Sequence, residues 1–142
     1  MPAVLLPDQL RDEWLTRLSD LIQTVRTWAG TLGWSTRQIE VTLTDSQIGK
    51  YKAPALLLQD DAIRILVEPI ARSAPGTEGV VDLYLMPAYD DIASLYHYDH
   101  DWHVHYKFPG TPTEATLRDS EAKPLSQETL REVLEAMKQN AV

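Results

Sequence analysis

Hydrophobic residues recur at helical spacing in the first quarter of the chain. They begin after Asp8, which can cap a helix, and stand three or four positions apart. The stripe consists of Leu10, Trp14, Leu18, Leu21, Val25, Trp28 and Leu32. Gly30 and Gly33 supply a stop signal. The pattern predicts a long amphipathic helix that packs on a sheet.

After this helix, hydrophobic and polar residues alternate with a period of two. In Thr36–Thr44, Ile39 alternates with Glu40 and Val41 with Thr42, which indicates a half-buried strand. The same reasoning predicts strands at 36–44, 55–59, 62–70 and 80–86. Loops are predicted at 45–54, 72–79 and 109–124. The short spacing between turns favours an antiparallel meander over β-α-β units.

The segment Ile92–Phe108 predicts a hairpin that holds all four histidines of the chain. A three-residue turn at Asp99–Asp101 would pair Tyr98 with Trp102 and His97 with His103. One face then carries Tyr96, Tyr98, Trp102, Val104 and Tyr106. The other face carries His97, His103 and His105, with Lys107 beyond them. A two-residue loop that places His97 opposite Val104 would break this pattern, so the register stays open.

A second helix is predicted after Ser126, which can cap it. Its apolar stripe is Leu130, Val133, Leu134 and Met137. The expected fold is therefore α+β, with an antiparallel meander sheet of about six strands flanked by an N-terminal long helix and a C-terminal helix, in a single globular domain over residues 1–142. Two helices are enough to cover one face of the sheet. The other face of the sheet would be exposed to solvent or covered by a partner.

The amino-acid composition and net charge disfavour several classes of function. The 142 residues include 44% hydrophobic side chains, which indicates a folded protein. A net charge of -8 disfavours nucleic acid as a partner, because phosphate neutralisation needs clustered lysines and arginines. The absence of cysteine excludes disulfides and thiolate chemistry. No segment has the length or apolarity of a signal or membrane span, so the expectation is a soluble cytoplasmic protein without membrane contact.

The histidines suggest one chemical hypothesis. On a shared hairpin face, His97, His103 and His105 could converge on zinc or another transition metal and leave a coordination position open. Asp99 and Asp101 would then orient the imidazoles from behind. The simpler interpretation is a polar hairpin face without any cofactor, whose histidines could also act as a pH-sensitive patch.

Other catalytic patterns lack the required context. Glu40, Glu68 and Asp82 could bind a hard divalent ion, but the chain lacks the carboxylate-lysine spacing of a metal-dependent nuclease. No Gly-x-Ser-x-Gly elbow and no phosphate-binding loop is present.

The aromatic residues support a different class of function. Tyrosine and tryptophan are enriched at binding hot spots. In this chain the candidates are Tyr89, Tyr96, Tyr98, Trp102 and Tyr106. The sequence therefore favours a non-enzymatic binding or adaptor-type module that contacts a protein partner or a second copy of itself through the sheet. The metal-binding protein or metal-dependent enzyme is the alternative.

Overall fold

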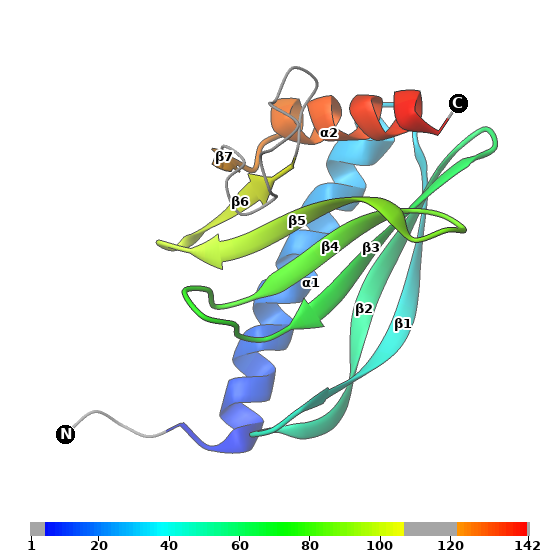
Figure 1. The fold of residues 1–142 in the computed structure, drawn as a ribbon. Coiled ribbons are helices and arrows are strands. Elements are labelled where there is room, and N and C mark those ends of the chain that lie inside the picture. The colour runs from blue at the N-terminus through cyan, green and yellow to red at the C-terminus, as the bar shows by residue number, and fades with distance from the viewer. Residues whose placement is uncertain (1–4, 107–121, 142) are drawn as a thin grey trace.

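The computed structural model describes residues 5–106 and 122–141. Two helices and seven strands follow one another along the chain (Figure 1). Their bounds are α1 (Pro7–Thr31), β1 (Ser35–Asp45), β2 (Gly49–Asp60), β3 (Ile63–Ala71), β4 (Val80–Leu85), β5 (Asp90–Tyr98), β6 (Asp101–His105), β7 (Ala122–Pro124) and α2 (Gln127–Asn140). The strands form one antiparallel sheet in the order β1-β2-β3-β4-β5-β6-β7. The α+β meander predicted from the sequence is confirmed.

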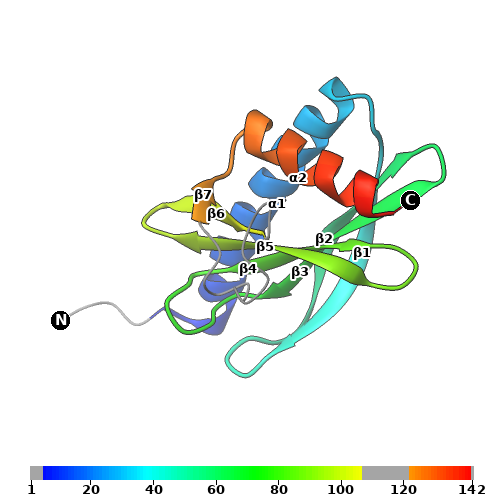
Figure 2. The ribbon, with the colours of Figure 1, turned by 45° about the horizontal axis from the view of Figure 1, so that its top comes forward.

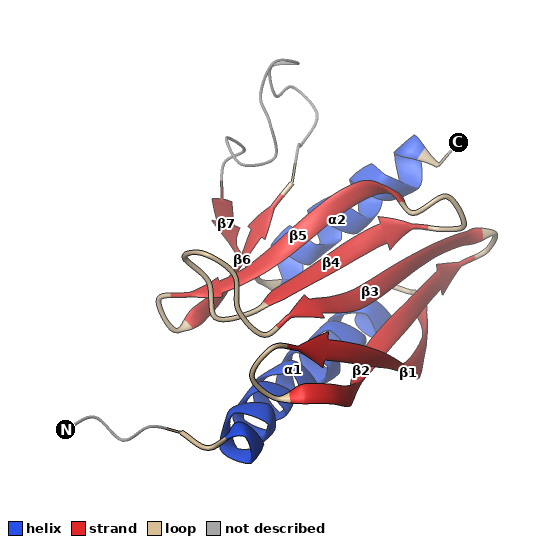
Figure 3. Cartoon of the chain, turned by 60° about the horizontal axis from the view of Figure 1, so that its bottom comes forward, coloured by secondary structure: helices blue, strands red, loops and turns tan. Residues whose placement is uncertain are grey.

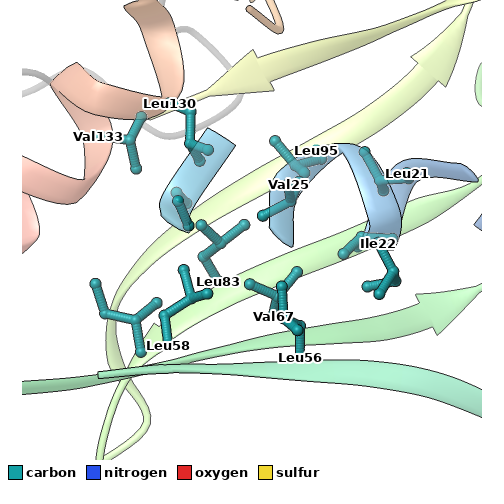
Figure 4. Close-up of a cluster of buried hydrophobic side chains, with 14 of the residues drawn as sticks. Leu21, Ile22, Val25, Leu56, Leu58, Val67, Leu83, Leu95, Leu130 and Val133 are labelled. Carbon is teal, nitrogen blue, oxygen red and sulfur yellow. The ribbon is translucent and has the colours of Figure 1, made fainter. Parts of the chain in front are cut away.

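Both helices lie on the same side of the sheet, because their apolar stripes need a common partner (Figures 2 and 3). From α1 the buried residues are Trp14, Leu18, Leu21, Ile22, Val25 and Ala29. From α2 they are Leu130, Val133, Leu134, Ala136 and Met137. Figure 4 shows five of these side chains, those of Leu21, Ile22, Val25, Leu130 and Val133, near apolar residues of the strands such as Leu58, Val67 and Leu95. The core is thus one apolar layer between the helices and one sheet face.

The helix boundaries confirm one expected cap and correct another. Ser126 caps α2, and its Oγ accepts a hydrogen bond from the backbone N–H of Thr129 at 3.1 Å. Asp8 does not cap α1, because the helix begins one residue earlier, at Pro7. A proline fits the first helical position, where its missing N–H has no partner to lose. Asp8 instead lies in the first turn, where a carboxylate favours the helix dipole.

The strands differ from the prediction in two places. Residues 49–54, expected in a loop, form the first half of β2 and pair with β1 up to Asp45 and Gly49. Asp45 Oδ1 closes the turn by accepting hydrogen bonds from the N–H groups of Gln47 and Ile48, at 2.7 and 3.1 Å. The second difference is β7, which lies at the end of the connection expected to be irregular. Residues 109–121 of that connection lie outside the described residues.

The β1–β2 ribbon separates from β3 along half its length. Pairing between β2 and β3 runs only from Leu56 to Asp60, so residues 49–55 pair with β1 alone (Figure 1). An ion pair closes the separated end: Arg72 Nε, just after β3, lies 3.2 Å from Asp45 Oδ2, and both side chains are about 15% exposed. Arg72 also donates to Gln47 Oε1 at 2.6 Å. The pair therefore holds the ribbon tip against the sheet.

Gly79 should tolerate no larger residue. Its φ is +156°, and an added Cβ would lie 2.7 Å from a ring carbon of Trp14 and 3.2 Å from one of Trp102. We expect Gly79→Ala to lower the free energy of unfolding by about 1–3 kcal/mol, because the buried rings must move. Urea denaturation measures this. Gly30→Ala is the matched control, since no atom lies within 4 Å of its added Cβ, and it should be neutral or slightly stabilising.

Removing the Arg72 charge should loosen the ribbon. Burial raises the pKa of Asp45, but hydrogen bonds from two backbone N–H groups and the charge of Arg72 outweigh it, so the pKa lies below its ordinary value. Arg72→Met should cost about 1–3 kcal/mol at neutral pH. The exposed pair Lys52–Glu40 supplies the control, and Lys52→Met should cost less than about 1 kcal/mol.

The pH dependence of this pair has a definite sign. A carboxyl group whose pKa is lower in the folded than in the unfolded state stabilises the folded protein at pH values above the unfolded-state pKa of about 4. This stabilisation is lost as the pH falls through the folded-state pKa. Arg72→Met should therefore differ most from the wild type at neutral pH and converge with it in acid. An equal loss of stability at every pH would contradict the ion-pair explanation.

Candidate functional site

The β5–β6 hairpin turns through two residues, not three. Asp99 and His100 have φ values of +52° and +64°, the left-handed conformation of a tight two-residue hairpin loop. Tyr98 therefore pairs with Asp101, and His97 with Trp102. The predicted three-residue loop was wrong. The alternative two-residue loop is the one present, but it pairs His97 with Trp102 and not with Val104 as expected. The sequence alone did not reveal that His100 joins Asp99 in the left-handed conformation.

This register moves His97 to the side of the sheet that faces the helices. Its ring meets the buried Trp102 edge to face, with ring centres 5.1 Å apart. His97 is 9% exposed, and its Nδ1 lies 3.5 Å from Glu78 Oε2. Burial and the charge of Arg17 lower the pKa of His97 and outweigh the attraction of Glu78. His97 thus lies at the margin of the core, where burial disfavours its protonated form.

On the opposite side of the sheet, the register brings four rings together. This outer ring cluster consists of Tyr96, Tyr98, His103 and His105. Tyr98 and His103 stack with centres 3.8 Å apart and planes inclined by 10°. Tyr96 meets His105 edge to face at 4.8 Å, and the hydroxyl of Tyr98 lies 3.4 Å from His105 Nε2. Each ring is partly buried, so the cluster is rigid and still accessible.

The turn between β3 and β4 forms a wall beside this cluster. Gly76 has a φ of +79°, and the N–H of Thr77 donates to the carbonyl of Ala74 at 2.9 Å, as in a turn with proline before glycine. An open hollow of about 560 Å³ lies between the turn and the rings. It is lined by Ala74, Pro75, Gly76, Thr77, Tyr96, Tyr98 and His105. The Pro-Gly pair signalled a turn in the sequence, but nothing local signalled that it would face the hairpin.

Next to the rings, the same face carries two carboxylates. Glu68 and Asp82 are directly opposite each other on β3 and β4. Asp82 accepts hydrogen bonds from Ser94 Oγ at 2.7 Å and from the hydroxyl of Tyr84 at 3.0 Å. Burial, and then the charge of Asp82, raises the pKa of Glu68. No basic side chain within residues 5–106 and 122–141 forms an ion pair with either carboxylate.

The candidate binding residues divide between the two faces. Tyr96 and Tyr98 lie in the outer ring cluster, and Tyr89 is 53% exposed beside Tyr84, with ring centres 5.6 Å apart. Trp102 and Tyr106 are buried on the helix side, at 9% and 3% exposure. The hydroxyl of Tyr106 donates to Asp91 at 2.9 Å. These two rings stabilise the fold, and three of the five candidates remain available to a ligand.

The three-histidine arrangement is not assembled. His103 and His105 share the outer face, but His97 points to the other side. Of the second-sphere candidates, Asp99 lies in the exposed turn, and Asp101 accepts a hydrogen bond from the N–H of Trp102 at 2.8 Å. Within the described part of the chain, no three His, Cys, Asp or Glu side chains are grouped so as to hold a metal ion.

The structure also places the serine and carboxylate candidates that were considered from the sequence. Ser94 donates its hydroxyl proton to Asp82 but is only 3% exposed, so its oxygen is not accessible to a substrate. Glu40 lies on β1, two strands away from Glu68, and faces Lys52 at 3.5 Å. Of the three carboxylates considered for a divalent ion, Glu68 and Asp82 are therefore brought together, and Glu40 is not. What remains accessible is a set of rings beside a hollow. Glu68 and Asp82 lie next to the rings, and neither forms an ion pair within the described residues.

Comparisons with protein-family models, with curated proteins and with solved structures find no match to this chain. No helix in the described residues is long and apolar enough to cross a membrane.

The stacked Tyr98 ring should control the titration of His105. Burial, and then the nearby His103, lowers the pKa of His105. Tyr98→Ala should expose the imidazole and raise the pKa of His105 toward its ordinary value near 6.5. NMR titration of the ring protons measures the shift, and Tyr89→Ala should leave it unchanged. An unmoved His105 pKa in Tyr98→Ala would show that this ring does not bury the imidazole.

Proposed function

We propose that this chain is a protein-binding module that contacts its partner through the outer face of the sheet. The observation that carries the proposal is that both helices cover one face (Figure 3). The other face presents the outer ring cluster beside a hollow of about 560 Å³. Concave sites lined by apolar and aromatic groups are the usual binding sites of proteins.

The kinds of side chain support a protein as the ligand. Tyrosine combines a large apolar ring with a hydroxyl and loses little conformational entropy on binding, so it recurs at interface hot spots. The stacking of Tyr98 on His103 fixes the ring before any partner arrives, which lowers the entropic cost of binding. A partner side chain that enters the hollow would contact Tyr96 and Tyr98 together.

The charges on this face indicate what kind of surface the partner carries. Glu68 and Asp82 face each other and form no ion pair with a basic side chain among the described residues, and the whole chain carries a net charge of -8. Like charges directly opposite each other destabilise a sheet, and a cation from outside would relieve that repulsion. The partner surface we infer is apolar at its centre and carries a lysine or arginine at its margin. The same charge disfavours nucleic acid.

Partner capture with matched variants tests this function. Cross-linked complexes would be isolated with wild-type protein, Tyr96→Ala and Tyr98→Ala from cells that naturally make it. The captured protein would then be purified and its affinity measured. Each ring variant should weaken binding by about 30-fold, the loss typical of a hot spot. Tyr98→Phe should retain most of the affinity, because it keeps the stacked ring.

Gln23→Ala, on the exposed side of α1, is the control for the opposite surface. It should bind as the wild type does. A partner that binds both ring variants with unchanged affinity, or that is lost equally in Gln23→Ala, would place the binding surface elsewhere. Circular dichroism and urea denaturation would show that each variant is folded.

A further inference from the structure

The first strand leaves a long edge of the sheet without a partner. β1 has eleven residues and pairs only with β2, and no other strand in the described part of the chain lies beside it (Figure 1). An edge of this length presents a row of main-chain N–H and C=O groups to another chain. β1 contains no proline, lysine or register shift, the devices that commonly block such pairing. The opposite edge, β7, has three residues and ends in Pro124.

The side chains of β1 alternate in a way that suits a second copy. Ile39, Val41 and Leu43 are only half-buried, although Val41 and Leu43 pack against the core. The residues between them are exposed and polar. A strand that extended the sheet beyond β1 would complete the burial of the apolar row. We propose that a second copy of this chain pairs antiparallel with β1, joining the two sheets into one.

Symmetry restricts the register of such a pair. An antiparallel pairing about a two-fold axis keeps each residue on its own face, so odd positions must face odd positions. Centring the axis on Val41 places Ile39 opposite Leu43 of the second copy, and Arg37 opposite Asp45 of the second copy. Apolar residues then meet apolar residues, and the charged pair at each end has opposite signs.

The neighbouring registers are worse. Centring on Glu40 sets that carboxylate against its own copy, which is unfavourable. Centring the axis on Thr42 places Ile39 opposite Asp45 of the second copy. Centring it on Ile39 places Arg37 opposite Val41 of the second copy. Both pairings set an apolar residue against a charge. Only the register centred on Val41 matches both the apolar row and the charges.

A hollow beside the strand leaves room for the second copy. It has a volume of about 410 Å³ and adjoins the middle of β1. Its lining comprises Leu15, Ser19, Gln38, Ile39, Glu40, Lys52, Ala53 and Pro54. In the register centred on Val41, Leu43 of the second copy lies opposite Ile39, next to Leu15 of α1. The hollow is thus positioned to receive that leucine.

Cysteine cross-linking tests both the dimer and its register, because the chain has no cysteine of its own. Val41→Cys should form a covalent dimer rapidly under mild oxidation or with a short thiol-reactive linker. Substitutions at 39, 40, 42 and 43 should cross-link less efficiently with distance from the axis. Ser46→Cys, in the β1–β2 turn, is the control: its two copies would be about 33 Å apart at about 3.3 Å per residue.

Light scattering on the cysteine-free chain should give twice the monomer mass. The exposed Arg37→Glu sets two carboxylates against each other at each end, and should weaken the dimer severalfold without unfolding the chain. A strict monomer at high concentration would overturn the proposal. A dimer whose cross-linking is equally efficient at position 46, or is greatest away from position 41, would overturn the β1 register.

Discussion

Trp14 is the contact on which the arrangement of this protein depends. Its ring is 1% exposed, and its Nε1 donates to the hydroxyl of Tyr51 at 2.9 Å, which fixes α1 to the β1–β2 ribbon. The same ring packs against Gly79, where the β3–β4 connection enters β4. One turn later in α1, Arg17 donates to the carbonyl of Glu78 at 3.0 Å. One helix thus joins the ribbon to the β3–β4 connection, two parts of the sheet that are otherwise linked through Arg72, Asp45 and Gln47.

This attachment has a consequence for the outer face. The connection held by Trp14 and Arg17 continues back into the turn that forms one wall of the hollow beside Tyr96 and Tyr98. It is also bonded to β5, because the N–H of Glu78 donates to the carbonyl of His97 at 2.7 Å. The wall and the rings are therefore fixed to the same core from two directions. A surface held in this way loses little entropy when it binds a ligand.

The sequence predicted correctly the elements whose hydrophobic residues follow one clear spacing. The prediction failed where the hydrophobic spacing fits more than one arrangement. The apolar stripe of α1 allows a single orientation of the helix on the sheet, because only one face of the helix is apolar. The hairpin has apolar or aromatic residues on both faces, so Tyr98 fitted opposite Trp102 as well as opposite Asp101. A shift of the turn by one residue exchanges the faces, which is how His97 came to be grouped with His103. Residues 49–54 were missed because Pro54 and the exposed Lys50 and Lys52 resemble a loop, whereas the ribbon tolerates them outside the main sheet.

The two proposed surfaces are compatible. β1 is separated from β5 by three strands, so pairing at the edge would leave the outer ring cluster uncovered. A two-fold axis perpendicular to the sheet would present both clusters on the same side. At about 4.8 Å per strand, the β5 strands of the two copies would be about 43 Å apart. A partner with two binding segments could then engage both clusters, and its second contact would benefit from a high effective concentration. Dimerisation at β1 would in this way increase the strength of weak binding at each face without altering either site.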